Sequence, residues 1–528
     1  MAQNNMQRSV NVDRLKEPFD MVIVGGGATG LGTAVEAAAR GHRVALLEAA
    51  DFARGTSSRS TKLVHGGVRY LAQGNFGLVR EALRERGRLR RNAPHLVGDL
   101  EFVVPAYAWW TGPYYGVGLK LYDVMAGKYR LGASELVSKR EVLDRIPTLE
   151  QEGLRGGIVY HDGQFDDARL AMSLALTAVD HGAVVVNHAP VIRLVHQNGR
   201  CAGVVVRDDE TGREHTVLGK VVVNATGVWS DELRRMDDPE AQPMVSPSQG
   251  IHLVLPRDFL PSRSALMVPK TDDGRVLFII PWHGRALVGT TDTQVERTDG
   301  EPQPLEEEIT FLLDHAARYL AKDPQRSDVL AVFAGLRPLV RPTNGGGQTK
   351  EISRDHTIAV SKNQLVTVVG GKWTTYRKMG EDTVDVATRV GELPEVPSPT
   401  AELRLHGAPE NAEISQEGVP DQVLQAYGTD ADAVRALAEE RPELARPLHA
   451  RLPYFAAEVV WAVRSEMART VEDVLSRRTR ALILDARAAL ECAPDVARLM
   501  AAELGRDELW QQAQLQAFRR VAENSVLS

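Results

Sequence analysis

Cysteine is nearly absent from this chain, which contains only Cys201 and Cys492 among its 528 residues. The two lie far apart and in none of the spacings that zinc ligands adopt, so neither a disulfide framework nor a metal site is expected. No run approaches the roughly 18 apolar residues that span a membrane. Residues 1–18 lack the apolar stretch of a signal peptide, and together these features predict a cytoplasmic protein.

The chain also lacks a strong excess of charge of either sign. The formal net charge is −7 at pH 7 and 25% of the residues are charged, which is ordinary for a protein surface in water. A nucleic-acid partner is not expected, because such proteins carry a strongly basic face. At roughly 150 residues per domain, the length predicts about three domains with room for a large core.

A strand, a glycine-rich turn, a helix and a second strand follow one another near the start of the chain. Residues 20–24 are apolar and predict a buried strand, residues 25–30 have the pattern G-x-G-x-x-G, and residues 31–40 form an Ala-rich amphipathic run typical of a helix. Residues 43–47 predict the second strand, and Glu48 follows it. This order is specific for a dinucleotide-binding unit.

The three glycines of this pattern have separate functions in such a unit. Gly25 permits the tight turn, Gly27 lets the backbone approach a pyrophosphate, and Gly30 lets the helix pack closely on the strand. Glu48 can accept hydrogen bonds from the ribose hydroxyls. The residues of this unit predicted to bind the cofactor are Gly25, Gly27, Ala28, Thr29, Gly30 and Glu48.

The loop after Glu48, residues 51–70, is dense in hydroxyls, glycines and cations. Such a loop can donate many hydrogen bonds to a diphosphate, and Gly66 and Gly67 let the backbone lie against a flat ring. This composition favours FAD over NAD, with a solvated surface loop as the alternative. The predicted cofactor contacts here are Thr56, Ser57, Ser58, Lys62, Leu63, His65, Gly66 and Gly67.

A row of arginines and a cluster of aromatic residues follow this loop. Residues 76–92 predict a helix with Arg80, Arg84, Arg88 and Arg91 on one face. Tryptophans and tyrosines then gather at residues 107–122 beside lysine and arginine, a composition typical of a membrane interface. We therefore expect peripheral membrane contact through residues 76–130, with a buried aromatic cluster as the alternative.

The second half of the cofactor-binding fold is predicted from strands that end in small residues. The strand over residues 217–224 leads into Ala225 and Gly227, and the strand over residues 364–369 leads into Gly371, Lys372, Trp373 and Thr374. Between these two strands, three segments with strand-like patterns predict an antiparallel sheet over the reactive end of the cofactor. Everything after about residue 411 is typical of helices.

The predicted fold class is therefore α/β with an added helical part. We expect a discontinuous Rossmann-like FAD-binding domain, an antiparallel-sheet substrate domain and an α-helical C-terminal domain. The expected ranges are 18–75, 160–248 and 330–392 for the first, 76–159 and 249–329 for the second, and 400–528 for the third.

In these motifs the chain resembles the FAD-dependent glycerol-3-phosphate dehydrogenases, flavoenzymes that pass electrons to quinone at the membrane. The resemblance covers about residues 19–390, and the helical tail also looks like the C-terminal domain of that family. Its motifs are residues 25–30 with Glu48, 56–58, 62–71, 335–339, 353–356 and 370–378, and in the tail 463–466 and 473–480.

The resemblance implies oxidation of sn-glycerol 3-phosphate to dihydroxyacetone phosphate, by hydride transfer from C2 to FAD. It also implies a quinone acceptor and peripheral association with the inner face of the cell membrane. The substrate is a small dianion, so we expect Arg69 and Arg337 to bind its phosphate, because a guanidinium fork matches phosphate oxygens. Tyr70 is expected beside them, and Lys372 is expected to serve both substrate and reduced flavin.

A proton acceptor for the C2 hydroxyl calls for a pKa near neutrality, which points to histidine. His252 is the first candidate and His65 the second. The predicted catalytic set is thus His252, Arg337, Lys372 and His65.

Several functions remain open on the residues alone. A glycerol-3-phosphate oxidase would use oxygen and form hydrogen peroxide through the same first step, and a flavoenzyme acting on amino acids would share the nucleotide fold. A flavin-containing binding protein that has lost catalysis is the alternative from another class. The tail leaves membrane docking and formation of a homodimer equally open.

Overall fold

The computed structural model of the chain describes residues 6–67, 74–108, 111–295, 301–341, 356–410 and 423–527. The side chains of residues 111–115, 117 and 423 are not part of this description. Some predicted residues therefore lie outside it, namely Arg69, Tyr70, Trp109, Trp110, Ser353, Arg354 and Asp355.

The glycine-rich turn leaves the end of a strand in an eight-stranded sheet, whose central order is β17-β18-β10-β1-β2-β7. β1 (Phe19–Val24) pairs in parallel with β2 (Val44–Leu47) and with β10 (Glu214–Asn224). β7 (Val184–Val186) and β18 (Val366–Gly370) extend the parallel part. Runs of Val, Ile and Leu suit these strands because both faces of the sheet are covered.

Helices cover one face of the parallel strands, and β8 (Val191–Gln197), β9 (Arg200–Arg207), α1 (Arg8–Arg14) and α8 (Ser230–Asp237) pack on the other. α2 (Ala28–Ala39), α7 (Asp167–Asp180) and α10 (Tyr376–Val390) pack together on the first face. α2 and α10 approach closely at Gly32 and Gly380, where an added Cβ on Gly380 would lie 2.6 Å from the Gly32 carbonyl oxygen. This part also contains β17 (His356–Val360).

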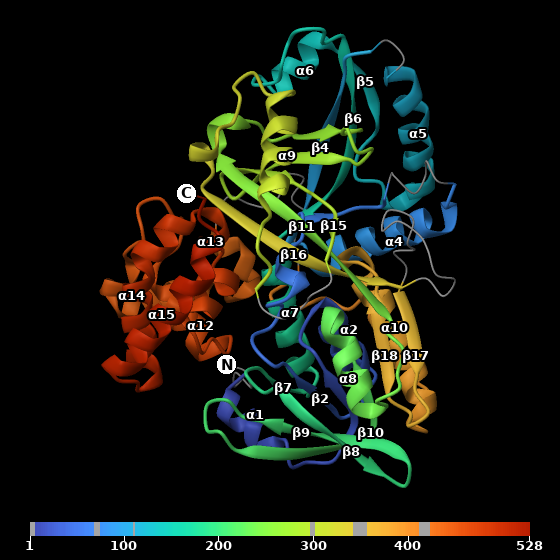
Figure 1. Cartoon of the computed structure of the whole chain (residues 1–528), viewed down its shortest axis with the longest axis vertical. Helices are drawn as coiled ribbons and strands as arrows, with labels where there is room; N and C mark the ends of the chain where they lie inside the picture. The colour runs from blue at the N-terminus through green and yellow to red at the C-terminus, as the bar shows by residue number, and fades with distance from the viewer. Residues whose placement is uncertain are drawn as a thin grey trace.

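A second sheet of ten strands lies beside the first, in the order β15-β11-β14-β13-β12-β4-β6-β3 (Figure 1). β16 pairs with β11, and β5 pairs with β6. Its neighbours are antiparallel, as predicted, apart from the parallel pair β4 and β12. The strands are β3 (Leu63–Val64), β4 (Val97–Ala106), β5 (Glu135–Ser138), β6 (Gly156–Phe165), β11 (Val245–Pro256), β12 (Ala265–Val268), β13 (Leu277–Trp282), β14 (Arg285–Gly289), β15 (Thr293–Gln294) and β16 (Ala331–Val340).

Four helices surround the second sheet: α4 (Phe76–Asn92), α5 (Thr111–Ala126), α6 (Lys139–Arg145) and α9 (Glu306–Ala317). The predicted arginine row of α4 does face solvent at Arg80, Arg84 and Arg91. Tyr122 of α5, however, is buried and donates to Asp162 across 2.8 Å. This aromatic residue therefore belongs to the core rather than to a membrane interface, because its hydroxyl has a buried carboxylate as partner.

The last part of the chain forms a group of helices against the second sheet, drawn in orange and red in Figure 1. Its α13 contacts β16, and its core is continuous with apolar side chains of β4, β6 and β13. A π-helical segment, η9, lies at residues Asp473–Arg478. The α-helices of this group are α11 (Ala431–Glu440), α12 (Ala456–Ser465), α13 (Ala481–Leu484), α14 (Ala486–Leu504) and α15 (Glu508–Glu523).

The predicted fold class, α/β with an antiparallel sheet and a helical C-terminal part, is confirmed. Among the described residues, no helix has both the length and the apolar content needed to cross a membrane.

The close approach of α2 to β1 can be tested at Gly30, where an added Cβ would overlap the Gly25 carbonyl oxygen. We expect Gly30→Ala to lower the free energy of unfolding by about 1–3 kcal/mol, the usual cost of overpacking. Gly77→Ala in α4 is the control, because nothing lies within 4 Å of its added Cβ. Equal stability of the two variants in denaturant unfolding would contradict this account of Gly30.

Candidate functional site

A cavity of about 730 Å³ lies where the glycine-rich turn of the first sheet faces the second sheet. This volume is typical of pockets that hold organic ligands. Seventeen of the predicted site residues line it, from both sheets and from the loop between β2 and β3. They are Gly25, Gly27, Ala28, Thr29, Glu48, Thr56, Ser57, Leu63, His65, Ala225, Gly227, His252, Arg337, Gly371, Lys372, Trp373 and Thr374.

The turn end of this cavity is built from backbone. Gly25 has a φ of 110°, and an added Cβ there would lie 2.5 Å from the Ala225 carbonyl oxygen. Gly27 caps α2, whose N-terminus opens on the cavity. Backbone N–H groups at a helix N-terminus favour an anion such as a pyrophosphate. The Ala28 N–H donates to Ser57 Oγ across 2.9 Å, so the loop and the turn are held together.

Glu48 is fixed at the end of β2 by two backbone donors. Its Oε2 accepts from the Gly26 N–H at 2.6 Å and its Oε1 from the Ala50 N–H at 2.9 Å. Burial raises the pKa of Glu48 although both donors act to lower it. The carboxylate therefore has one defined orientation at the rim of the cavity.

Five of the predicted cofactor contacts do not line the cavity: Gly30, Ser58, Lys62, Gly66 and Gly67. Lys62 is fully buried, and its Nζ lies 2.6 Å from Asp167 Oδ2 and 2.8 Å from the Ser58 carbonyl oxygen. Gly66 donates its N–H to the Tyr122 hydroxyl at 2.8 Å. Lys62 and Gly66 are thus held by partners behind the cavity wall, and a direct contact of these five residues with a cofactor stays a prediction.

His252 stands on β11 with its ring in a tight slot. Its Nε2 lies 2.9 Å from Thr61 Oγ1, and its ring stacks on Phe333 with 4.8 Å between centroids. An added Cβ at Gly289 would overlap the ring, so glycine is required opposite it on β14. Within the described part of the chain, the buried Nδ1 of His252 has no hydrogen-bond partner.

The pKa of His252 lies well below its usual value, because of burial first and the cations Lys62 and Arg337 second. The expectation of a pKa near neutrality is thereby corrected. At neutral pH the imidazole is uncharged, and one of its two nitrogens can accept a proton.

Arg337 of β16 points at the same region. Its Nη1 donates to the Gln249 carbonyl oxygen at 3.1 Å and lies 3.3 Å from Asp292 Oδ1. Its Nη2 donates to Thr290 Oγ1 at 3.2 Å and to the Thr291 carbonyl oxygen at 2.9 Å. These contacts fix the guanidinium, which presents a rigid positive charge to the cavity.

The segment after β18 joins three parts of the wall. Lys372 precedes the short helix Trp373–Thr375, which leads into α10. Trp373 donates its indole N–H to the Ser57 carbonyl oxygen at 2.8 Å, and the His65 N–H donates to Thr374 Oγ1 at 3.2 Å. Lys372 and His65 are thereby set at one cavity.

Several residues that line the cavity were not among the predicted site residues, notably Arg59, Thr61, Trp229, Gly250 and Phe278. Arg59 donates to the Ala334 carbonyl oxygen at 3.0 Å and forms an ion pair with Glu301. The first two belong to the hydroxyl- and cation-rich loop already singled out, so their composition carried a signal. Gly250 carried none, since its purpose is to leave space for the Arg337 guanidinium.

The donor set fits a dinucleotide whose reactive ring lies at the histidine end. A helix N-terminus and hydroxyl groups line the cavity and suit phosphate groups, and a neutral imidazole and fixed cations line it as well and suit a hydride donor and a ring that gains negative charge. The family model described as "FAD dependent oxidoreductase" matches residues 20–377, and fold and site together define that class. The model "C-terminal domain of alpha-glycerophosphate oxidase" matches residues 398–513.

Relatives narrow the class. The chain is 41% identical over 531 residues to "Glycerol-3-phosphate dehydrogenase, mitochondrial" of Homo sapiens, covering 95% of this chain and 73% of the relative. It is also 41% identical over 546 residues to "Glycerol-3-phosphate dehydrogenase SDP6, mitochondrial" of Arabidopsis thaliana, covering 96% and 86%. The chain therefore belongs to the FAD-dependent glycerol-3-phosphate dehydrogenase family.

Solved structures agree with this assignment. The glycerol-3-phosphate dehydrogenase from Bacillus halodurans, complexed with FAD, is 29% identical with a TM-score of 0.80, covering 99% of this chain and 98% of that chain. L-alpha-Glycerophosphate Oxidase from Mycoplasma pneumoniae has a TM-score of 0.55 at 20% identity, covering 72% of this chain and 97% of that one, which shows a shared fold.

The lowered pKa of His252 can be measured by NMR with labelled histidine, using His252→Gln to assign its signal. We expect the signal to stay in its neutral position as the pH falls through about 6.5, where an unperturbed histidine titrates. His406 is the matched control, because Asp180 and Asp430 overcome its burial and raise its pKa to about 10. A His252 midpoint at or above the unperturbed value would contradict the effect of burial and the two cations.

Proposed function

We propose that this chain oxidises sn-glycerol 3-phosphate to dihydroxyacetone phosphate. The observation that carries the proposal is that His252, Arg337 and Lys372 line one cavity with the dinucleotide-binding turn, in a chain of this family. FAD, when bound there, supplies an acceptor for the hydride that leaves C2 of the substrate. Every other requirement, namely phosphate recognition, proton transfer and cofactor placement, falls on the residues of the chain.

Recognition of the phosphate rests on fixed positive charge. Arg337 is held in place by four protein contacts, so a dianion meets a guanidinium that needs no further ordering. Lys372 lines the same cavity and adds a second cation. Arg69 and Tyr70 lie outside the described residues, and their part in binding the phosphate stays a prediction.

Removal of the C2 hydroxyl proton is assigned to His252, which is neutral and lines the cavity. The cations Arg337 and Lys62 make protonation of this imidazole unfavourable. A bound phosphate dianion offsets their field and raises the pKa of His252, so the base becomes stronger when the substrate is present. His65, which also lines the cavity, remains the second candidate.

Cofactor placement is assigned to the turn and to the loops around it. The α2 N-terminus and Ser57 face the pyrophosphate region, and Glu48 orients the ribose. Lys372, at the start of the helical segment before α10, would supply positive charge to stabilise the negative charge of the reduced ring.

For the electron acceptor we propose a membrane quinone, reached from the inner face of the cell membrane. Exposed apolar side chains support a membrane-contacting face on α5 and β5: Leu121 is 42% exposed, Val124 76% and Leu136 65%. Lys120 and Lys128 lie in the same segment of the chain, a combination that suits a lipid surface. Oxygen is the alternative acceptor, since the fold is shared with an L-alpha-glycerophosphate oxidase. Formation of a homodimer through the helical tail stays open.

The proposal is tested by adding sn-glycerol 3-phosphate to the purified yellow protein without oxygen. We expect the flavin absorption band to bleach, because the substrate delivers two electrons to the ring. Admitting a quinone analogue or oxygen then distinguishes dehydrogenase from oxidase by the rate of recolouring and by hydrogen peroxide. A band that persists at saturating substrate would refute the assigned substrate.

The phosphate-binding role of Arg337 is tested by Arg337→Met. Loss of a charged contact of about 1.5–3 kcal/mol should weaken substrate binding about ten- to a hundredfold. Arg193→Met is the control, because Arg193 lies on β8, is exposed and pairs with Glu214. Bleaching titrations give the apparent affinity, and a value for Arg337→Met equal to that of the control would argue against the role.

A further inference from the structure

The loop between β2 and β3, residues 48–62, lies between the cavity and the C-terminal helices. One side lines the cavity through Glu48, Thr56, Ser57 and Thr61. The other side faces the C-terminal helices, where a short arginine-rich motif had no assigned role. This motif is residues 473–480, and it contains three arginines that are all buried.

Two of these arginines converge on one carboxylate of the loop. Arg477 Nε lies 2.6 Å from Asp51 Oδ2, and Arg478 donates to both oxygens of Asp51 at 2.7 and 2.8 Å. The π-helical turn at Asp473–Arg478 brings these consecutive side chains to the same partner. Such turns are rare and are often found at functional sites.

The third arginine holds the next part of the loop. Arg480 Nη2 donates to the Ser58 carbonyl oxygen at 2.7 Å and lies 3.0 Å from Asp167 Oδ1. The other oxygen of Asp167 accepts from the Ser60 N–H at 3.0 Å and from Lys62 Nζ at 2.6 Å. The backbone on either side of the cavity-lining Thr61 is therefore fixed from behind.

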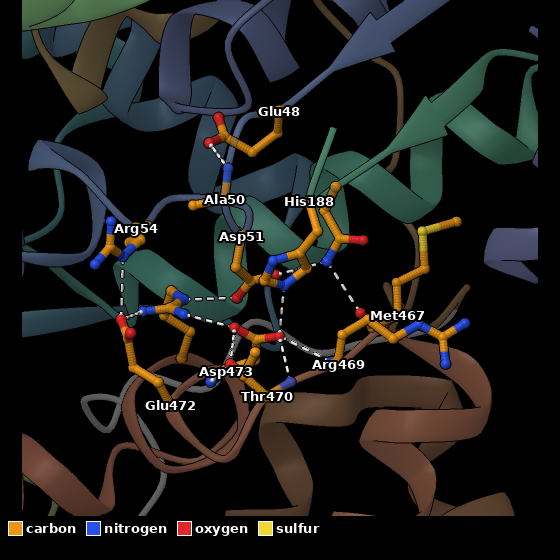
Figure 2. A network of polar contacts seen from close by, with 12 residues as sticks. Glu48, Ala50, Asp51, Arg54, His188, Met467, Arg469, Thr470, Glu472 and Asp473 are labelled. Atoms are coloured by element: carbon orange, nitrogen blue, oxygen red, sulfur yellow. Dashed lines mark hydrogen bonds and ion pairs between the residues drawn. The ribbon is translucent and has the colours of Figure 1, made fainter. Parts of the chain in front are cut away.

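The same contacts extend to the rim near Glu48 (Figure 2). Asp473 Oδ2 lies 2.9 Å from His188 Nε2, and the His188 N–H donates to the Ala50 carbonyl oxygen at 2.5 Å. Glu472 accepts from Arg477 at 2.9 Å and from Arg54, which lines the cavity, at 3.3 Å. One network thus touches the loop at both ends.

We propose that Arg477, Arg478 and Arg480 are positioning residues for the cofactor, through which the C-terminal helical domain sets how tightly the chain holds FAD. They do not line the cavity, so they act through residues 48–62. The inference rests on the FAD site of the proposed function and assigns a role to the helical domain within that site.

Chemistry favours this role over simple structural support. Replacing buried ion pairs with apolar side chains is often neutral or stabilising, so such pairs are a weak source of stability. A forked guanidinium instead fixes the direction of its carboxylate partner. Every arginine of the motif contacts a group on or directly beneath the loop. These contacts therefore fix the conformation of the backbone that lines the proposed cofactor site.

The test uses the full-length holoprotein and measures the FAD released on dilution, by flavin fluorescence. Asp51→Asn removes the charge that Arg477 and Arg478 share, and we expect the dissociation constant of FAD to rise at least about tenfold. Arg478→Lys keeps a charge but loses the fork, and should fall between the parent and Asp51→Asn. Circular dichroism identical to that of the parent shows that the folded chain is being compared.

The matched control is Glu36→Gln, which changes another buried carboxylate, paired with Arg40 at 2.6 Å on α2 and outside the cavity. Its FAD affinity should stay within about twofold of the parent, since it does not touch the loop. Equal weakening by Asp51→Asn and Glu36→Gln would overturn the proposal, as would parental affinity in Asp51→Asn.

A second variant, at a partly exposed side chain, tests the proposal if Asp51→Asn does not fold. Glu472→Gln weakens the contacts to Arg54 and Arg477 at a side chain that is 17% exposed. It should release FAD more readily than Glu36→Gln, and affinity equal to that control would overturn the proposal. A parent protein that holds no FAD would instead refute the proposed function, which is a separate failure.

Discussion

Asp51, on the loop of residues 48–62, and Asp167, beneath that loop, are both fully buried. Each stays compatible with the fold because an arginine of residues 477–480 reaches it. A buried carboxylate without a partner would cost several kcal/mol, so loop, helical domain and cavity wall have to form together. The turn at Gly25 and the strand that carries Arg337 complete the cavity beside this loop, whose position the ion pairs fix. The arrangement of the residues that line the cavity thus depends on ion pairs that do not line it themselves.

Local pattern was enough for the elements that start the fold. Both flanking strands were predicted to within one residue, and the helix begins three residues earlier than predicted, at Ala28. Such agreement is possible because periodicity and turn chemistry are encoded within a few neighbours. The pairing of Lys62 with Asp167 could not be predicted, because the two residues are 105 positions apart and no local pattern records such a contact. The burial of Tyr122 could not be predicted for the same reason. Aromatic composition indicated a membrane interface, but the hydroxyl of Tyr122 binds a carboxylate that is distant in the sequence, and the ring lies in the core.

The cavity also shows why residue type alone did not settle the pKa of the candidate base. Histidine suggested a group that titrates near neutrality, yet burial and two cations lower the pKa of His252 well below that range. One of these cations, Arg337, lines the cavity where an anionic substrate can bind. Substrate charge and base strength are therefore linked through Arg337, a coupling that only the three-dimensional arrangement reveals.

The position of the arginine motif in the chain has a consequence for synthesis on the ribosome. Asp51 is separated from Arg477 and Arg478 by 426 and 427 positions, so its partners leave the ribosome long after Asp51 does. During that interval the nucleotide-binding turn is already outside the ribosome, while the loop that follows it lacks the arginines that fix its buried carboxylate. Translation therefore has to pass the arginine motif before this loop can take the conformation that it has in the folded protein.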